Sequence, residues 1–289
     1  MKENVVSTKT KKKFSFRFNR GQLCIPYALF LVLFVIFPTL VIFYYAFTSK
    51  TGSISFENFI EFFKNPMYFR TILTSLGIAF LSTIGCLLIG YPVAYVLSRI
   101  KSHRKTILLL LFIMPMWINF VLRANAMKEL LNLIGLSGKN DYLCTVIGMI
   151  YDYLPFMILP LYSTLIKIET NLEEAAYDLG ADSKRVFTKV TLPLSMPGIA
   201  SGITMVFLPV MTCYVISDMY GGGKIEIIGG VIDMIFGQQD YNLASVISIV
   251  MLLIMLIGSL IAGKFSSKET TRGTILWKSS SLFSPLFLR

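Results

Sequence analysis

Long runs of apolar residues without charged side chains dominate the pattern of this sequence. A helix needs about 20 mostly apolar residues to cross the hydrocarbon layer of a membrane. Four longer runs contain no Asp, Glu, Lys or Arg, a fifth contains only Asp152, and the run 106–122 is shorter. We therefore predict six membrane-spanning helices, at about 23–47, 71–98, 106–122, 142–166, 199–221 and 241–263.

The composition agrees with a membrane protein. Hydrophobic residues make up 55% of the 289 residues and charged residues only 15%, with a mean hydropathy of +0.68. A soluble domain carries about a quarter charged residues, so a water-soluble enzyme and a disordered chain are both excluded. We expect an all-α membrane protein with one six-span domain over 21–264, between a basic N-terminal segment 1–20 and a tail 265–289.

The positions of the basic residues predict the orientation in the membrane. Lys and Arg close to span ends stay on the cytoplasmic side. Both ends of the chain and every second loop between the predicted spans together hold 20 of the 27 basic residues, and the remaining loops hold seven. Both termini are therefore expected in the cytoplasm, and the loop 167–198 lies on the same side. The net charge of +11 follows from this topology, so we expect membrane lipid and no nucleic acid as a partner.

Residues that could carry catalysis are scarce. His103 is the only histidine and lies in a basic loop. Residues 221–223 are three glycines before Lys224, but Asp218 stands where a phosphate-binding loop needs its first glycine and Ile225 replaces its hydroxyl residue. The cysteines lie on four different spans without short pairing, which predicts neither a disulfide framework nor a metal site: Cys24, Cys86, Cys144 and Cys213. We expect a non-catalytic chain that does not hydrolyse ATP.

The loop 167–198 has the local signals of two short helices. Asn171 is a good N-cap with Glu174 three residues later, and Gly180 can supply a left-handed ending. Asp182 or Ser183 can cap a second helix, which carries Lys189 near its end and is expected to stop at Pro193. From these signals alone, a solvated loop and a partner-binding loop are both open.

The spacing within this loop favours the partner-binding interpretation. Glu174-Ala175-Ala176, three residues, Gly180, nine residues, Val190, one residue and Leu192-Pro193 resemble the signature loop of ATP-binding-cassette importer permeases; Val190 stands where isoleucine is usual. The resemblance implies a type I importer permease fold. It also implies that the loop docks into a cleft of a cytoplasmic ATPase and transmits its motion through Glu174, Ala175, Ala176, Gly180, Leu192 and Pro193.

Further segments narrow the resemblance. The sequences 155–163 and 194–199, together with Tyr214-Val215-Ile216-Ser217-Asp218 and the following glycines, are similar to permease subunits of spermidine/putrescine importers. Such a family implies a dimer with a second homologous permease, two copies of an ATPase that binds ATP and Mg, and an external substrate-binding protein. The chain itself would bind no cofactor and would lie in the inner membrane of a bacterium.

Two carboxylates within the predicted spans are candidates for a cation pathway. Acidic residues inside a membrane usually face a cavity, a pathway or a partner charge, and Asp152 and Asp218 both fall in the outer half. An organic polycation is recognised by carboxylates and aromatic faces, which Trp117, Tyr151 and Tyr214 could supply. The alternatives are a structural hydrogen bond for Asp152, an interfacial position for Asp218 and ordinary membrane anchoring for the aromatic residues.

The cargo and the energy source remain open on the sequence alone. Related permeases carry sulfate, molybdate, iron or phosphate esters on the same scaffold, and a fold does not determine its cargo. Three other classes of function also remain open: a stand-alone secondary transporter, an intramembrane enzyme and a non-transporting assembly subunit.

The fifth span contains residues that disturb a helix. Proline residues 193, 197 and 209, with Gly198, are expected to bend or break it.

Overall fold

The computed structural model describes residues 24–49, 52–100, 104–136 and 138–282. These residues are almost entirely helical, and an isolated β-bridge joins Thr48 to Ile54. Five helices are long and apolar enough to cross a membrane, or six if a bent helix pair counts as one span. The expectation of an all-helical chain with about six spans is confirmed at this level. The basic segment 1–20 and His103 lie outside the described residues.

The spans follow the apolar runs closely, apart from the third and the fifth. The first, Ile25–Ala46, combines α1 Cys24–Leu31, the π-helical segment η2 Val32–Ile36 and α2 Phe37–Ala46. The remaining long spans are α4 Pro66–Arg99, α7 Asp141–Leu165, the continuous helix Ser183–Thr212 and the apolar part Tyr241–Ile261 of α13 Tyr241–Leu282. The short helix α3 Glu57–Lys64 connects α2 to α4.

The third span, which we expected over 106–122, is bent. The helix α5 Arg104–Ile113 passes into a 3₁₀ turn, η3 Met114–Trp117, and α6 Phe120–Leu133 then leaves at 98°. Ile118 is extended, and the Asn119 side chain caps α6 by accepting from the N–H groups of Val121 and Leu122. The part before the bend is about 20 Å long at 1.5 Å per residue, too short to cross the hydrocarbon layer by itself.

The fifth span starts earlier and ends earlier than the expected 199–221. The helix α9 Ser183–Val186 continues through the π-helical segment η4 Phe187–Thr191 into α10 Leu192–Thr212, so Pro193 does not end it. A π-helical turn is wider than an α-helical one and can accommodate a proline ring. Helical geometry ends at Cys213, where ψ is 83°, and α11 Tyr214–Gly221 is a separate helix.

Close helix packing around α7 holds the bundle together. Met157 of α7 lies between Gly90 of α4 and Gly202 of α10: a Cβ on either glycine would come within 3.1 Å of the Met157 side chain. A Cβ on Gly198 would similarly lie 2.7 Å from the Thr164 hydroxyl. Small residues allow membrane helices to approach this closely without a side chain between them. The packing fixes α4, α7 and α10 as one unit.

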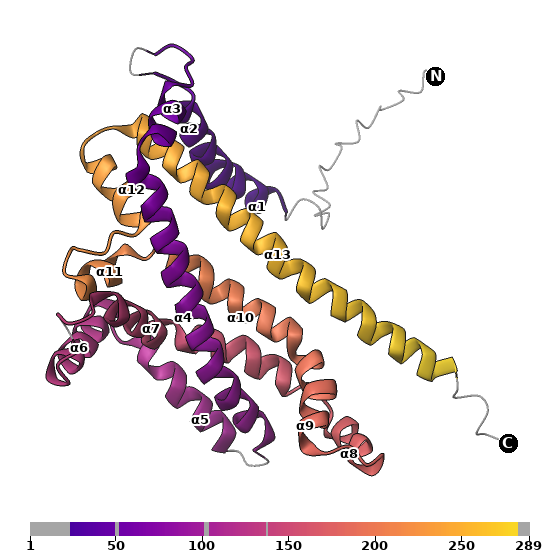
Figure 1. Cartoon of the computed structure of the whole chain (residues 1–289). Helices are drawn as coiled ribbons and strands as arrows, with labels where there is room; N and C mark the ends of the chain where they lie inside the picture. Colours follow the sequence, from indigo (N-terminus) through magenta and orange to yellow (C-terminus); the bar gives the residue numbers. More distant parts are fainter. Residues whose placement is uncertain (1–23, 50–51, 101–103, 137, 283–289) are drawn as a thin grey trace, which may run out of the picture.

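The two ends of the bundle carry different short helices (Figure 1). One end, which we call the α8 end, carries α8 Thr170–Asp178 and α9 beside the junction of α4 and α5. The opposite end, which we call the α12 end, carries α3, α11 and α12 Ile228–Gly237. The first span lies along the beginning of α13 and contributes no buried residue over its most apolar window. Its outer faces are therefore available to lipid or to another membrane protein.

Candidate functional site

At the α8 end, the first of the two expected short helices is present as α8, whereas the second begins at Ser183 as expected and continues into α10. Gly180 ends α8 with a left-handed φ of +81°, as predicted. The Asp182 carboxylate caps α9 by accepting from the Arg185 N–H at 3.2 Å, which is also as predicted. The N-cap of α8 is Glu169, however, and not Asn171. The chain leaves α7 in a tight turn closed by the bond from Ile168 N to Leu165 O, so α8 begins already at Thr170.

The structure separates the expected coupling residues into two groups. Glu174, Ala175 and Gly180 are exposed and Ala176 is half-buried, and the neighbouring Leu179 is 89% exposed at the end of α8. Leu192 and Pro193 are half-buried at the start of α10, where the chain enters the bundle. A helix that leaves small and apolar residues uncovered at its tip is suited to insertion into a groove of another protein.

Asp152 forms a buried ion pair with Arg123. The Arg123 Nε donates to Asp152 Oδ1 at 2.5 Å, and its Nη1 donates to the carbonyl oxygen of Pro115 at 3.0 Å. The Arg123 guanidinium also lies 5.9 Å from the centroid of the Tyr151 ring. This arrangement ties α7 to both sides of the 98° bend. It accounts for a carboxylate inside the membrane through a partner charge, one of the alternatives left open by the sequence.

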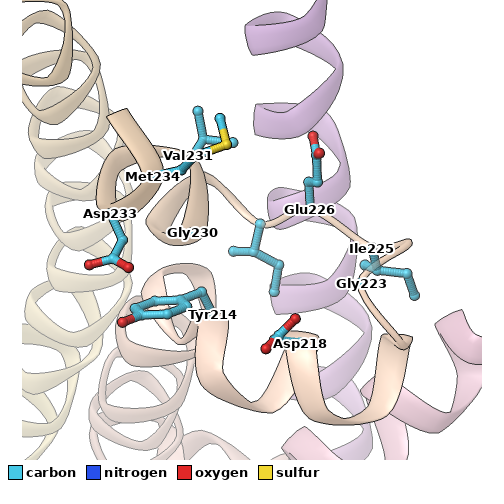
Figure 2. A pocket seen from close by; sticks show the side chains of 10 residues that line it. Tyr214, Asp218, Gly223, Ile225, Glu226, Gly230, Val231, Asp233 and Met234 are labelled. Carbon is cyan, nitrogen blue, oxygen red and sulfur yellow. The ribbon is translucent and has the colours of Figure 1, made fainter. Parts of the chain in front are cut away.

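Asp218 and Tyr214 instead line an open pocket at the α12 end. The pocket has a volume of about 230 Å³ and lies between α11, the loop 222–227 and α12. Two carboxylates that the sequence analysis did not select, Glu226 and Asp233, line it as well. Figure 2 shows the Tyr214 ring between Asp233 and Asp218, while the Glu226 carboxylate points away from them.

The three pocket carboxylates keep their negative charge available. All three residues are exposed, and within the described part of the chain none of them forms an ion pair. Of the five expected pathway residues, the structure therefore brings Asp218 and Tyr214 together in this pocket. It places Asp152 and Tyr151 around Arg123, and the exposed Trp117 lines no part of the pocket.

Close backbone packing forms the walls of the pocket. A Cβ on Gly229 would lie 2.2 Å from the Thr212 carbonyl oxygen, so α12 begins directly against the break that follows α10. The Ser217 hydroxyl donates to Ile225 O at 2.8 Å, which holds the loop against α11. The start of α12 is also bonded to α4, because the Ile228 N–H donates to the Ser75 hydroxyl at 2.8 Å.

This fold matches a known class of transport proteins. The family described as binding-protein-dependent transport system inner membrane component matches residues 6–267, and the chain belongs to this family. It is therefore the permease subunit of a binding-protein-dependent ABC importer in the inner membrane. As a permease it is non-catalytic and binds no cofactor itself.

Curated relatives are permeases with named cargoes. The chain is 36% identical over 247 residues to the spermidine/putrescine transport system permease protein PotB of Haemophilus influenzae, covering 78% of this chain and 86% of the relative. It is 34% identical over 249 residues to PotB of Escherichia coli K12, covering 78% and 90%. This chain is thus a homologue of the PotB permeases.

A solved transporter shares the fold. The crystal structure of a bacterial alginate ABC transporter in complex with alginate pentasaccharide-bound periplasmic protein matches with a TM-score of 0.68 and 17% identity, covering 86% of this chain and 93% of that chain. At this identity the likeness supports the permease fold and leaves the cargo open.

Proposed function

We propose that this chain forms the transmembrane pathway for polyamines such as spermidine and putrescine. The homology to PotB permeases over 78% of the chain carries this proposal, and the pocket at the α12 end adds a chemical reason. A polyamine is a flexible chain of ammonium groups. Unpaired carboxylates attract it, and an aromatic face adds a cation–π contact.

Within the pocket, Asp218 and Asp233 are the proposed contacts for ammonium groups and Tyr214 the proposed aromatic face. The three residues lie together in Figure 2. Glu226 is proposed to contribute to the negative potential at the pocket mouth, because it lines the pocket while its carboxylate points outward. Asp152 and Tyr151 are proposed to act structurally, since Arg123 already neutralises the buried carboxylate.

The orientation follows from the basic residues. The segments at the α8 end and at both chain termini hold 20 of the 27 Lys and Arg residues. Because such residues stay in the cytoplasm, we propose that the α8 end and both termini are cytoplasmic. The acidic pocket then faces the side from which a binding protein delivers cargo.

The proposed partners complete an importer. The exposed tip of α8, with Glu174, Ala175 and Leu179, docks into a cytoplasmic ATPase dimer, which binds the ATP and Mg. A second homologous permease and lipid cover the exposed apolar faces of the spans, beginning with Ile25–Ala46. ATP-driven closure of the ATPase pulls on α8 and opens the pathway outward, and hydrolysis returns it to the inward-open state.

Uptake of labelled spermidine into vesicles that contain the whole complex tests the cargo. We expect D218N and D233N each to raise the KM several-fold, because each removes one charge from the pocket, while E129Q, which removes an exposed charge on α6, leaves it unchanged. Sulfate, molybdate, iron or a phosphate ester competing with spermidine would point to another cargo. An unchanged KM in both pocket variants would contradict the role of the pocket.

The coupling assignment needs a separate test. We expect E174R to abolish uptake while the permease still inserts into the membrane, because a long basic side chain replaces the exposed carboxylate at the docking tip. ATP hydrolysis by the complex should then continue without uptake or cease with loss of the ATPase from the complex. Normal uptake by E174R, or uptake by the wild-type chain without any ATPase, would contradict it; the second result would favour a secondary transporter.

A further inference from the structure

Glu173, the neighbour of the exposed Glu174, points into the protein and holds α8 to two other helices. Its carboxylate forms an ion pair with the guanidinium of Arg99, the last residue of α4. The same carboxylate oxygen accepts a hydrogen bond from the Thr191 hydroxyl at 2.7 Å, directly before α10. The two charged side chains are only 12% and 21% exposed, so water screens this pair far less than a surface pair.

A second layer of contacts holds the end of α4 in place. The Arg99 guanidinium lies 5.5 Å from the centroid of the Tyr95 ring. Phe187 of η4 packs edge-on against both Tyr95 and Tyr91, with centroid distances of 6.1 and 5.8 Å. The Tyr91 hydroxyl is hydrogen-bonded to Ser195 of α10 at 2.9 Å. A displacement of α8 therefore acts on α4 through a charged contact backed by packed rings.

Toward its opposite end, the same helix contacts α12, which forms one side of the acidic pocket. Ser75 of α4 is fully buried and accepts from the N–H of Ile228, the first residue of α12. Ser75 and Arg99 lie 24 positions apart on the same helix, which continues through Pro92, and this spacing is about 36 Å at 1.5 Å per residue. Figure 1 shows α4 extending from α12 to the α8 end. The helix α4 thus contacts both α8 and α12, one of the helices that line the pocket.

We propose that Glu173 is a positioning residue that couples α8 to α4 through Arg99, and that α4 carries the movement to the pocket through Ser75. This inference rests on the proposed function, because it assumes that an ATPase moves α8. It assigns different tasks to two adjacent glutamates: Glu174 faces the ATPase, and Glu173 transmits the movement inward. A physical explanation of coupling between distant sites names an element whose equilibrium both sites bias, and α4 is that element here.

The test uses the whole complex in vesicles and measures ATP hydrolysis together with polyamine uptake. E173Q removes the charge but keeps an oxygen that can accept from Thr191. We expect the ATPase to remain bound and the number of ATP molecules hydrolysed per polyamine to rise about tenfold, within the range typical of coupling between sites. The exchanged pair R99E/E173R should lower this ratio again, because it restores an ion pair between α4 and α8. A merely structural role would reduce the amount of complex and leave the ratio unchanged.

Two further variants separate the steps. S75A removes the acceptor of the Ile228 N–H, and we expect it to raise the same ratio while stimulation of ATP hydrolysis by the loaded binding protein persists. R185Q is the matched control: it removes the 3.7 Å ion pair with Asp182 on α9, whose side chains are 72% and 66% exposed, and should leave the ratio unchanged.

The outcomes distinguish this inference from the proposed function. If the wild-type complex takes up polyamine without ATP, or no ATPase is retained, the proposed function is wrong. If the wild-type complex depends on ATP and E173Q keeps the wild-type ratio, the coupling role of Glu173 is wrong. A wild-type ratio in S75A would overturn the step from α4 to the pocket, and a raised ratio in R185Q would show that any lost ion pair in this loop has the same effect.

Discussion

Replacing Asp152 with asparagine separates a structural role of this residue from a role in cargo binding. In the structure its carboxylate is completely buried and bonded to Arg123, whose side chain is only 8% exposed. Asparagine still offers an oxygen to the Arg123 Nε. The variant therefore keeps the hydrogen bond and loses the neutralising charge, so that the guanidinium remains buried and uncompensated.

The expected cost is large. Removing one partner of a buried ion pair destabilises a protein by about 3–5 kcal/mol. Because about 1.4 kcal/mol corresponds to a tenfold change, the folding equilibrium constant should fall by about two to three and a half powers of ten. The double variant R123M/D152L removes both charges and loses the Arg123 bonds to Pro115 O and, at 3.5 Å, to Asp152 O. An unsatisfied buried carbonyl costs about 1–3 kcal/mol. The double variant should thus be more stable than D152N.

Equilibrium unfolding of the purified full chain in mixed micelles measures this difference. In a W277F background Trp117 is the remaining tryptophan. It lies in η3 together with Pro115, and Arg123 donates a hydrogen bond to the Pro115 carbonyl oxygen. Its fluorescence reports on the bend. The four chains of the cycle, wild type, R123M, D152L and R123M/D152L, give the interaction energy of the pair, and D152N is measured beside them.

A different result would refute this reasoning. If D152N unfolded like the wild type and raised the KM for spermidine in the assembled transporter, the carboxylate would face cargo and the ion pair with Arg123 would not persist in the transporting protein. If both single variants and the double variant lost the same stability, the charge of the pair would not be the source of the effect.

Two further predictions concern the walls around the pocket. G229A should lower spermidine uptake, because its Cβ would lie 2.2 Å from Thr212 O and force α12 away from α10. The control variant is G237A on the same helix, whose Cβ would meet no atom within 4 Å and which should transport normally. Equal uptake in both variants would contradict this prediction. Y220F removes the hydroxyl that donates to Ala124 O at 2.7 Å and should cost about 1 kcal/mol in unfolding free energy; a loss below measurement error would show that this bond does not hold α6 to α11.

Local chemistry explains why parts of the loop 167–198 could be predicted. Gly180 and Asp182 act through the residues next to them, one by a left-handed φ and the other by capping the next N–H groups. The start of α8 could not be read in this way, because a turn from the end of α7 sets it. The role of Glu173 could not be predicted either, because its partners Arg99 and Thr191 lie 74 and 18 residues away in the sequence.

The bent third span shows what a hydropathy pattern leaves undetermined. The apolar run 106–122 predicts a span, and Arg123 is the charged residue directly after it. In the structure Arg123 is buried, because the 98° bend turns it toward α7. A signal was present: an acidic residue inside one span and a basic residue at the end of the preceding one often pair within a membrane protein.

The partner of each carboxylate indicates its task. Asp152 pairs with Arg123 in the bundle, Glu173 with Arg99 at the α8 end and Asp141 with Lys224 at the α12 end. A paired carboxylate has little net charge to offer a polycation, because its partner already cancels the potential.

Asp218, Glu226 and Asp233 differ, since among the described residues none of them forms an ion pair and all three line one pocket. Asp152 was selected as a cargo residue because it lies within an apolar run. The same position buries it inside the membrane, and for that reason its charge needs a partner within the protein. The carboxylates that we propose to attract cargo lie instead at the exposed end of the bundle, where water stabilises an unpaired charge. In the proposed orientation, a polyamine would meet this end first.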